Sequence, residues 1–326
     1  MQIDKTTDTS HSNPFPFNNL FLIKGYVTGQ NQFWMYLAGI VAAFLGYVAF
    51  QIIMMVPLMS AAASKGIPTS EIMKNPNILF NPDAIGMNKS LLLALMMGMF
   101  VFTLLFFWLA IKFFQQKPLS SVITGFEKIR WKRYFFSFAV WSGLILLLTI
   151  VSYLLSPQDL EIRFDAGSFM VLLVVAVVFI PIQTATEEIL FRGYLMQGIG
   201  QVFKNGIAPL IITSVLFGLM HGTNPEAKAH GLLIMMPYYI LFGAFLGILT
   251  LLDEGAELAM GIHCANNLVS SLLVTSKNSV LQTDAVFYTT TENPGAEFLS
   301  WAIMAAVCFF ILFKKYKLSN WKLLVK

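Results

Sequence analysis

The sequence predicts an all-α membrane protein, a polytopic bundle of about eight transmembrane helices. Hydrophobic residues make up 57% of the 326 residues and charged residues only 12%, about half of the roughly 25% that is usual in soluble proteins. Apolar runs of about 20 residues recur, which is the length that a helix needs to cross a hydrocarbon core of about 30 Å. A bilayer accepts only helices or closed barrels, and the ten-residue alternation of barrel strands is not visible in the sequence.

The predicted spans share a high apolar content and a length near this requirement. They cover residues about 33–58, 90–111, 134–155, 168–187, 207–222, 232–252, 258–275 and 298–313. The chain then divides into four parts. These are a polar cytoplasmic amino-terminal tail at 1–32, a first set of transmembrane helices with their loops at 33–165, a second transmembrane region at 166–316 and a basic cytoplasmic tail at 317–326.

Most of the 21 Lys and Arg residues fall on the side of the two termini. The positive-inside rule therefore predicts a multi-pass protein of the cell's inner or plasma membrane with both termini in the cytoplasm. No nucleic-acid partner is expected, because the basic residues cluster at helix ends, and no signal peptide is expected. Cys264 and Cys308 lie in predicted spans, as buried free thiols. His11 and His230 lie in a tail and a loop, where incidental roles are expected.

Two adjacent glutamates and an arginine follow the almost wholly apolar fourth run. If the helix continues, Glu188 and Arg192 share a face, with the acid on the amino-terminal side, which is the better orientation for an ion pair. Glu187 is turned about 100° away. Its carboxylate is not fully occupied by the arginine and is poorly solvated, which suits a general base. The simpler alternative is that all three residues meet water at the cytoplasmic end of the span.

Two further motifs lie in the following spans. His221 ends an apolar run, with Phe217 four residues before it on the same face. His263 and Asn267 are also four apart, so their side chains project together from the seventh span.

The hairpin lengths place these side chains at similar heights. The turn at 205–206 follows Glu187 by about 18 residues and precedes His221 by about 15, so antiparallel packing sets the two level. His263 reaches the same level if the first hairpin protrudes from the bilayer into the cytoplasmic interface. We therefore predict one site, about 10 Å below the cytoplasmic surface, lined by Glu187, His221, His263 and Asn267.

The ordered set Glu-Glu-x-x-x-Arg at 187–192, Phe-x-x-x-His at 217–221 and His-x-x-x-Asn at 263–267 resembles the signature of the CAAX protease and bacteriocin-processing (Abi) family. Its members are intramembrane endopeptidases of the type II CAAX prenyl endopeptidase kind. The resemblance implies that 166–316 is the catalytic region, that Glu187 activates a water and that His221 helps to hold or polarise it. It further implies that His263 and Asn267 stabilise the oxyanion. The supporting residues are Glu188, Arg192 and Phe217.

The ligand types leave metal dependence open. Glu187, His221 and His263 could supply three ligands to a catalytic zinc with an open fourth position. His-Glu-x-x-His is absent, however, and we favour a reaction without a cofactor. Asn267 is a poor zinc ligand but a good oxyanion donor, and Glu187 cannot easily be both ligand and base. No serine or cysteine nucleophile with a matched base is present, although Cys264 lies close enough to require a control.

The expected partners are the lipid bilayer and a membrane-embedded or lipid-anchored peptide substrate. A prenylated Cys-a-a-X tail is the eukaryotic association of the family, and nothing in this sequence indicates it. Two other functions stay compatible with the residues. One is a peptide-binding membrane protein of bacteriocin immunity, and the other is a proton-coupled transporter. Cleavage that depends on Glu187 and His221 would distinguish the protease from both.

Overall fold

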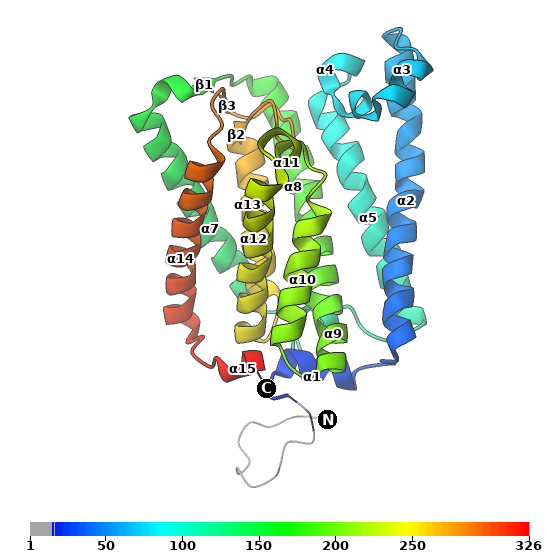
Figure 1. The fold of residues 1–326 in the computed structure, drawn as a ribbon, viewed down its shortest axis with the longest axis vertical. Coiled ribbons are helices and arrows are strands. Elements are labelled where there is room, and N and C mark those ends of the chain that lie inside the picture. The colour runs from blue at the N-terminus through cyan, green and yellow to red at the C-terminus, as the bar shows by residue number, and fades with distance from the viewer. Residues whose placement is uncertain (1–14, 16, 326) are drawn as a thin grey trace.

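The computed structural model describes residues 15 and 17–325, and helices make up most of it (Figure 1). The long helices follow the long axis of the molecule, whereas short helices and strands lie at its two ends. The elements, in chain order, are α1 (Leu20–Val27), α2 (Phe33–Ser64), α3 (Thr69–Lys74), η1 (Pro76–Phe80), α4 (Pro82–Ile85), α5 (Lys89–Phe113), α6 (Ser120–Ile123), α7 (Trp131–Leu155), η2 (Pro157–Asp159), β1 (Leu160–Ile162), α8 (Ala166–Glu188), η3 (Ile189–Leu195), α9 (Met196–Phe203), α10 (Ile207–Met220), α11 (Pro225–His230), α12 (Leu232–Asp253), α13 (Glu257–Leu273), β2 (Val274–Thr275), β3 (Phe287–Thr289), α14 (Pro294–Tyr316) and α15 (Lys322–Val325).

Six helices of the described chain are long and apolar enough to cross a membrane. They are α2, α5, α7, the continuous stretch Ala166–Phe203, α12 and α14. Two other predicted spans are helical but shorter, because α10 has 14 residues and α13 has 17. The all-α membrane bundle is therefore confirmed, whereas the count of about eight transmembrane helices stays a prediction.

Helix α13 is enclosed by the rest of the bundle. It packs against α7, α8 and α12, and its residues from Glu257 to Ala265 are all buried. The outer helices instead turn apolar side chains outward, such as Phe44, Ile150 and Val174. Side chains of this kind suit contact with lipid, whereas the polar side chains of a transmembrane bundle belong inside it. The polar side chains of α13 are therefore shielded from lipid by the apolar outer helices.

The fourth predicted span continues beyond its apolar part, as expected from the hairpin argument. Helix α8 leads into the π-helix η3 and then into α9 without a break. The α-helical hydrogen-bond pattern gives way to π-helical bonds at Ile189. Such turns are rare and are frequent at functional sites. The sequence did not predict this change of helix type, which falls directly after the glutamate pair.

The amino-terminal segment is only partly the tail that we predicted. Its first 14 residues lie outside the described part, but α1 packs under the bundle (Figure 1). Phe21 and Leu22 are fully buried against Met196 and Leu251. Asn19 caps α1 and donates a hydrogen bond to the carbonyl oxygen of Leu251 at 2.8 Å. Burial of these apolar side chains explains why a segment that reads as polar docks here.

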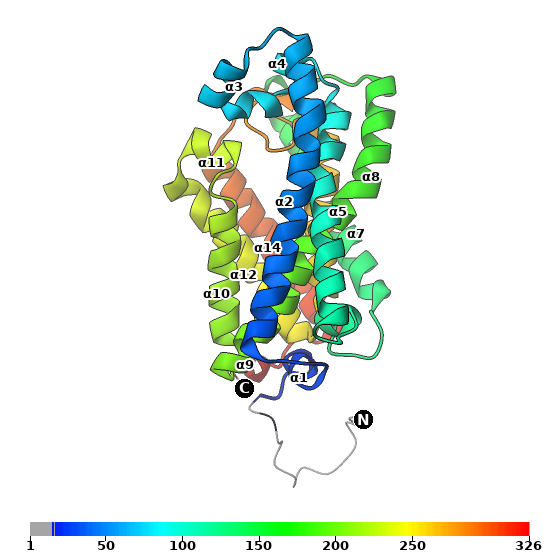
Figure 2. The same ribbon diagram turned by 90° about the vertical axis from the view of Figure 1, so that its right-hand side faces the viewer.

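The opposite end carries short elements. A three-stranded sheet has the order β1-β3-β2, with β1 antiparallel and β2 parallel to β3. The long loop at 60–89 holds α3, η1 and α4 above α2 and α5, which run side by side (Figure 2). We call this end, with the sheet and α11, the sheet end, and the end with α1, α9 and α15 the basic end.

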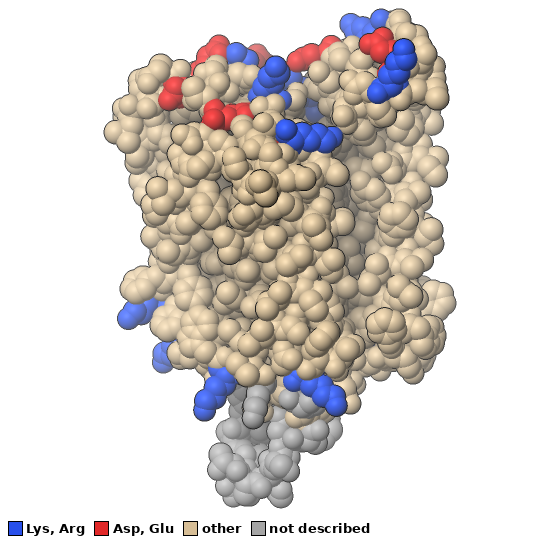
Figure 3. All heavy atoms as spheres, viewed as in Figure 1, with Lys and Arg blue, Asp and Glu red and all other residues tan. Residues whose placement is uncertain are grey.

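Charge separates the two ends. On the face in Figure 3, only Lys and Arg residues mark the basic end, both signs of charge mark the sheet end, and the broad middle carries neither. A middle free of charge suits a hydrocarbon core, and the basic end is the one for which the sequence predicts a cytoplasmic position.

Candidate active site

The last turn of α8 brings Glu187 into a polar chain with two amides. Gln183 lies one turn before Glu187, and its Nε2 donates a hydrogen bond to Oε1 of Glu187 at 2.6 Å. Oε1 of Gln183 accepts a hydrogen bond from Nδ2 of Asn267 on α13 at 3.0 Å. The second carboxylate oxygen of Glu187, Oε2, is buried and makes no hydrogen bond. Gln183 thus links the two helices and leaves one oxygen of Glu187 free to accept a proton.

Glu188 forms a separate, fully buried cluster. Nη1 of Arg192 lies 2.8 Å from Oε1 of Glu188, and neither side chain is exposed. The ion pair predicted from the spacing is therefore confirmed, although the intervening helix is π rather than α. The same oxygen lies 2.7 Å from Nδ1 of His263. Separating these residues would leave an uncompensated charge in the protein interior, which is costly. The ion pair and the hydrogen bond therefore hold Glu188, Arg192 and His263 in place.

The contact with Glu188 fixes the orientation of the His263 ring. Nδ1 donates to the carboxylate, so Nε2 points to the other side, 3.7 Å from Oε2 of Glu187. Nε2 also lies 3.4 Å from Nδ2 of Asn267. A separation of 3.7 Å between two polar groups is one that a water molecule can bridge. Glu187, at 14% exposure, is more accessible than His263, at 3%.

Phe217 is the apolar centre of the site. The guanidinium carbon of Arg192 lies 4.1 Å from the centroid of its ring, which is a favourable position for a cation over an aromatic face. The same ring lies 4.4 Å from the ring of His221 and 5.9 Å from that of His263, centroid to centroid. Phe217 is buried. It therefore packs against both imidazoles.

His221 ends α10 with one nitrogen engaged. Its Nδ1 lies 2.8 Å from the carbonyl oxygen of Phe217, to which it donates, so Nε2 is the nitrogen left for other partners. The ring also packs against Tyr239 of α12, with 5.1 Å between centroids. No hydrogen bond or ion pair joins the described side chains of His221 and Glu187. The ring of His221 therefore neighbours the site through Phe217, and its place in one pocket with Glu187 stays a prediction.

The structure brings Glu187 close to His263 and Asn267, which the hairpin lengths predicted, and it places His263 and Asn267 on one face, which the helical spacing predicted. Gln183 was missed, although its side chain contacts two of these residues. The only signal for it was an amide one turn before Glu187 in an apolar run, which is more often a satisfied helix side chain. Tyr239 was missed as well, because a tyrosine in a membrane helix carries no motif.

The predicted zinc ligands do not form a metal centre as they are placed. Among the described residues, no group of three or more His, Cys, Asp or Glu side chains could hold a metal ion. Nδ1 of His263 is engaged by Glu188, and Nδ1 of His221 by a backbone carbonyl, so Nε2 is the ring nitrogen that each histidine could offer to a ligand.

Comparison with known proteins agrees with the geometry. Residues 166–269 match the family model described as type II CAAX prenyl endopeptidase Rce1-like. The chain is also similar to the uncharacterized protein YyaK of Bacillus subtilis (strain 168), with 30% identity over 271 residues, which is 82% of this chain and 87% of that protein. The chain belongs to the Rce1-like family.

The family match starts at α8 and ends within α13. It thus includes every residue of the polar chain and of the buried cluster, and it indicates a membrane protease of the CAAX type. No solved structure matches the chain significantly.

Proposed function

We propose that this protein is an intramembrane endopeptidase that hydrolyses a peptide bond with a water activated by Glu187. The observation that carries the proposal is the free Oε2 of Glu187, which faces the His263 ring at 3.7 Å beside the amide of Asn267. A base and two hydrogen-bond donors around one small space are what the hydrolysis of an amide needs.

In the proposed reaction, Oε2 of Glu187 accepts a proton from water while the water oxygen attacks the scissile carbonyl carbon. The carbonyl oxygen becomes an oxyanion, which accepts hydrogen bonds from Nδ2 of Asn267 and, in the doubly protonated ring, from Nε2 of His263. Glu187 then gives its proton to the leaving amine as the C–N bond breaks. Removing one oxyanion donor of this kind typically costs about 10² to 10³ in rate.

The buried cluster supports this chemistry without contacting the substrate. His263 lies between two carboxylates, and the fully buried Arg192 balances the charge of the fully buried Glu188. A balanced site avoids the large cost of an isolated buried charge. Nε2 of His221, whose ring packs on Phe217, suits a role in holding the water or the substrate carbonyl.

The substrate in this proposal is a membrane-associated, lipidated or otherwise hydrophobic peptide. A site built between membrane helices is reached by a peptide that the bilayer already holds, through an apolar segment or a lipid anchor. The proposal includes no prenyl specificity, because no described residue of the site indicates one.

The proposal is tested in living cells by comparing the termini of membrane-protein peptides. Cells carry the wild-type chain, Glu187→Gln or, as a matched control, Glu161→Gln, a surface carboxylate paired with Arg163. We expect a set of new termini in wild-type and control cells that is absent with Glu187→Gln at equal protein levels. Identical termini in all three would refute the proteolytic function and favour a binding or transport role.

Two controls separate related mechanisms. Cys264→Ala should keep the cleavage, because the reaction uses no thiol. Cleavage by the purified protein should also survive stringent chelation, whereas its loss on chelation and return with zinc would support the metalloprotease instead.

A further inference from the structure

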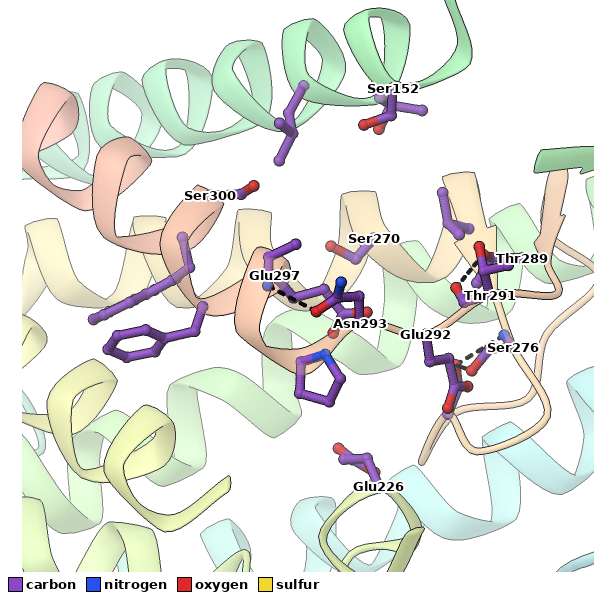
Figure 4. A pocket seen from close by; sticks show the side chains of 18 of the residues that line it. Ser152, Glu226, Ser270, Ser276, Thr289, Thr291, Glu292, Asn293, Glu297 and Ser300 are labelled. Carbon is purple, nitrogen blue, oxygen red and sulfur yellow. Dashed lines mark hydrogen bonds between the residues drawn. The ribbon is translucent and has the colours of Figure 1, made fainter. Parts of the chain in front are cut away.

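A cavity of about 730 Å³ lies between α7, α12, α13 and α14 at the sheet end, under α11 and the segment 274–293 (Figure 4). Its size is that of a ligand-binding site, which typically measures about 300–1,000 Å³. Side chains from several elements point into it, among them Glu226, Glu292 and Glu297. None of the motif residues lines it, so it is a compartment beside the site described above.

One layer of side chains separates the cavity from the candidate active site. Tyr239 lines the cavity, and its ring packs against that of His221. Asn266 lines it too, and its Nδ2 donates to Oδ1 of Asn267 at 3.1 Å. A ligand in the cavity is therefore next to two of the proposed active-site residues, one on α10 and one on α13.

The walls of the cavity combine two kinds of chemistry. Trp141, Ile145, Trp301 and Met304 form an apolar part deep within the bundle. The part toward the sheet end carries the acidic side chains. The carboxylates that line the cavity are Asp159, Glu226, Glu292 and Glu297.

Positive charge is scarce in these walls. The lining contains no Lys or Arg, and His230 is its one basic side chain. Nε2 of His230 lies 2.9 Å from Oε2 of Glu292. Other carboxylates of the lining thus lack a basic partner among the cavity walls, and the cavity is acidic as a whole.

Two of the acidic residues outside the membrane helices, Glu226 and Glu292, have pKa values shifted in opposite directions. Burial alone would raise the pKa of Glu292, but hydrogen bonds from Ser276 and Asn278 outweigh it and lower that pKa, so Glu292 is ionised. Burial raises the pKa of Glu226. A cation placed beside Glu226 would favour the ionised form of this carboxyl group. A bound cation would then interact with Glu226 in addition to Glu292.

We propose that this cavity binds a cationic amphipathic peptide and presents it to the active site from the sheet end. The apolar part takes hydrophobic side chains, and the acidic part takes Lys or Arg side chains. This inference rests on the proposed function, whose substrate class it narrows. The sequence predicted a site near the cytoplasmic surface, whereas in this proposal the peptide enters from the sheet end; at the basic end, α1 and α15 are held to Leu251 and Gly206 by hydrogen bonds.

Binding is measured with full-length protein carrying Glu187→Gln in detergent, so that turnover plays no part. The probes are two labelled helical peptides with the same apolar residues and either Lys or Glu at every polar position. We expect the Lys peptide to bind at least about tenfold more tightly than the Glu peptide. The double variant Glu292→Gln/Glu297→Gln should weaken its binding by about fivefold or more.

The matched control is Glu161→Gln, at the same end of the molecule but outside the cavity lining. It should leave the affinity for the Lys peptide unchanged. Equal binding of both peptides, or equal binding by the control and the double variant, overturns the proposal. Selective binding without any cleavage by the wild-type protein would instead retain the cavity assignment and refute the proteolytic function.

A separate experiment, thiol labelling inside the cavity, tests whether the peptide enters from the sheet end. Ser300, which points into the cavity (Figure 4), is changed to cysteine. A membrane-impermeant thiol reagent is then added to intact cells. Cys264 and Cys308 are buried, so the unsubstituted chain gives the background. We expect labelling at residue 300 in intact cells and protection by the Lys peptide. Labelling that requires permeabilised cells would contradict entry from the sheet end.

Discussion

At the scale of single residues, Gln183 decides how Glu187 is presented. Its amide engages Oε1 of Glu187 and Asn267 at once, which leaves Oε2 of Glu187 as the free oxygen. Gln183 is a positioning residue, because in the proposed reaction it acts through its neighbours rather than on the substrate.

Gln183→Leu keeps the size of the side chain and removes both hydrogen bonds. We expect kcat to fall about 10- to 100-fold with KM nearly unchanged, since a small misplacement of a catalytic group has effects of this order. Thr184→Val is the matched control, because the hydroxyl of Thr184 bonds to carbonyls of its own helix and, on α13, to Cys264 rather than to Asn267. Steady-state kinetics check this prediction, and a change in KM alone would contradict a positioning role.

At the scale of elements, the placement of the site depends on how α13 packs against α7. Gly261 lies two residues before His263, and a Cβ at this position would overlap the backbone carbonyl oxygen of Tyr134 and the hydroxyl of Ser137. A close approach of the two helices therefore requires glycine here, as is common where membrane helices meet.

Gly261→Ala should push α13 away from α7. Overpacking of this kind typically costs about 1–3 kcal/mol, so we expect a lower melting temperature in detergent and a loss of cleavage. Gly143→Ala on α7 is the control, because nothing lies within 4 Å of a Cβ there. It should keep both stability and activity. Equal melting temperatures and equal cleavage in the two variants would show that the contact between α13 and α7 does not position the active-site residues.

Much of the arrangement of elements could be predicted from the sequence, because the bilayer fixes the length and composition of a span. The pairing of Glu188 with Arg192 and the shared face of His263 and Asn267 followed from helical spacing alone. The π-helix η3 could not be predicted, because it depends on contacts with other segments. The docking of α1 and the contact of His221 with Tyr239 likewise depend on packing between distant elements.

At the scale of the whole molecule, the two ends differ in how they are closed. At the basic end, Lys117 lies in a buried polar contact under α1 and α2. Its Nζ donates to the carbonyl oxygen of Gly25 at 3.1 Å and to the hydroxyl of Tyr36 at 3.0 Å. Burial lowers the pKa of Lys117 from 10.5 to about 8. Closure of this end is therefore linked to pH.

Between about pH 8 and 10.5 the unfolded chain binds more protons at Lys117 than the folded chain does, so the free energy of unfolding rises with pH in this window. Lys117→Met should remove that rise. We expect the stability of the wild type relative to this variant to increase by about 2 kcal/mol from pH 7.5 to 9.5. Thermal unfolding in detergent at each pH measures the free energy of unfolding. The control is Lys112→Met, at an exposed position, which should keep the increase of this free energy with pH. An equal slope in Lys117→Met and the wild type would contradict the linkage.

The most direct test of the central claim is cleavage of a hydrophobic peptide by purified protein in lipid vesicles, with Glu187→Gln compared with Glu161→Gln. Monodisperse elution and an unchanged melting temperature confirm that each variant is folded. We predict that Glu187→Gln loses cleavage by about 10³-fold or more, as expected for removal of a general base, while Glu161→Gln matches the wild type. Cleavage by folded Glu187→Gln at the wild-type rate would contradict the role of Glu187 in activating water.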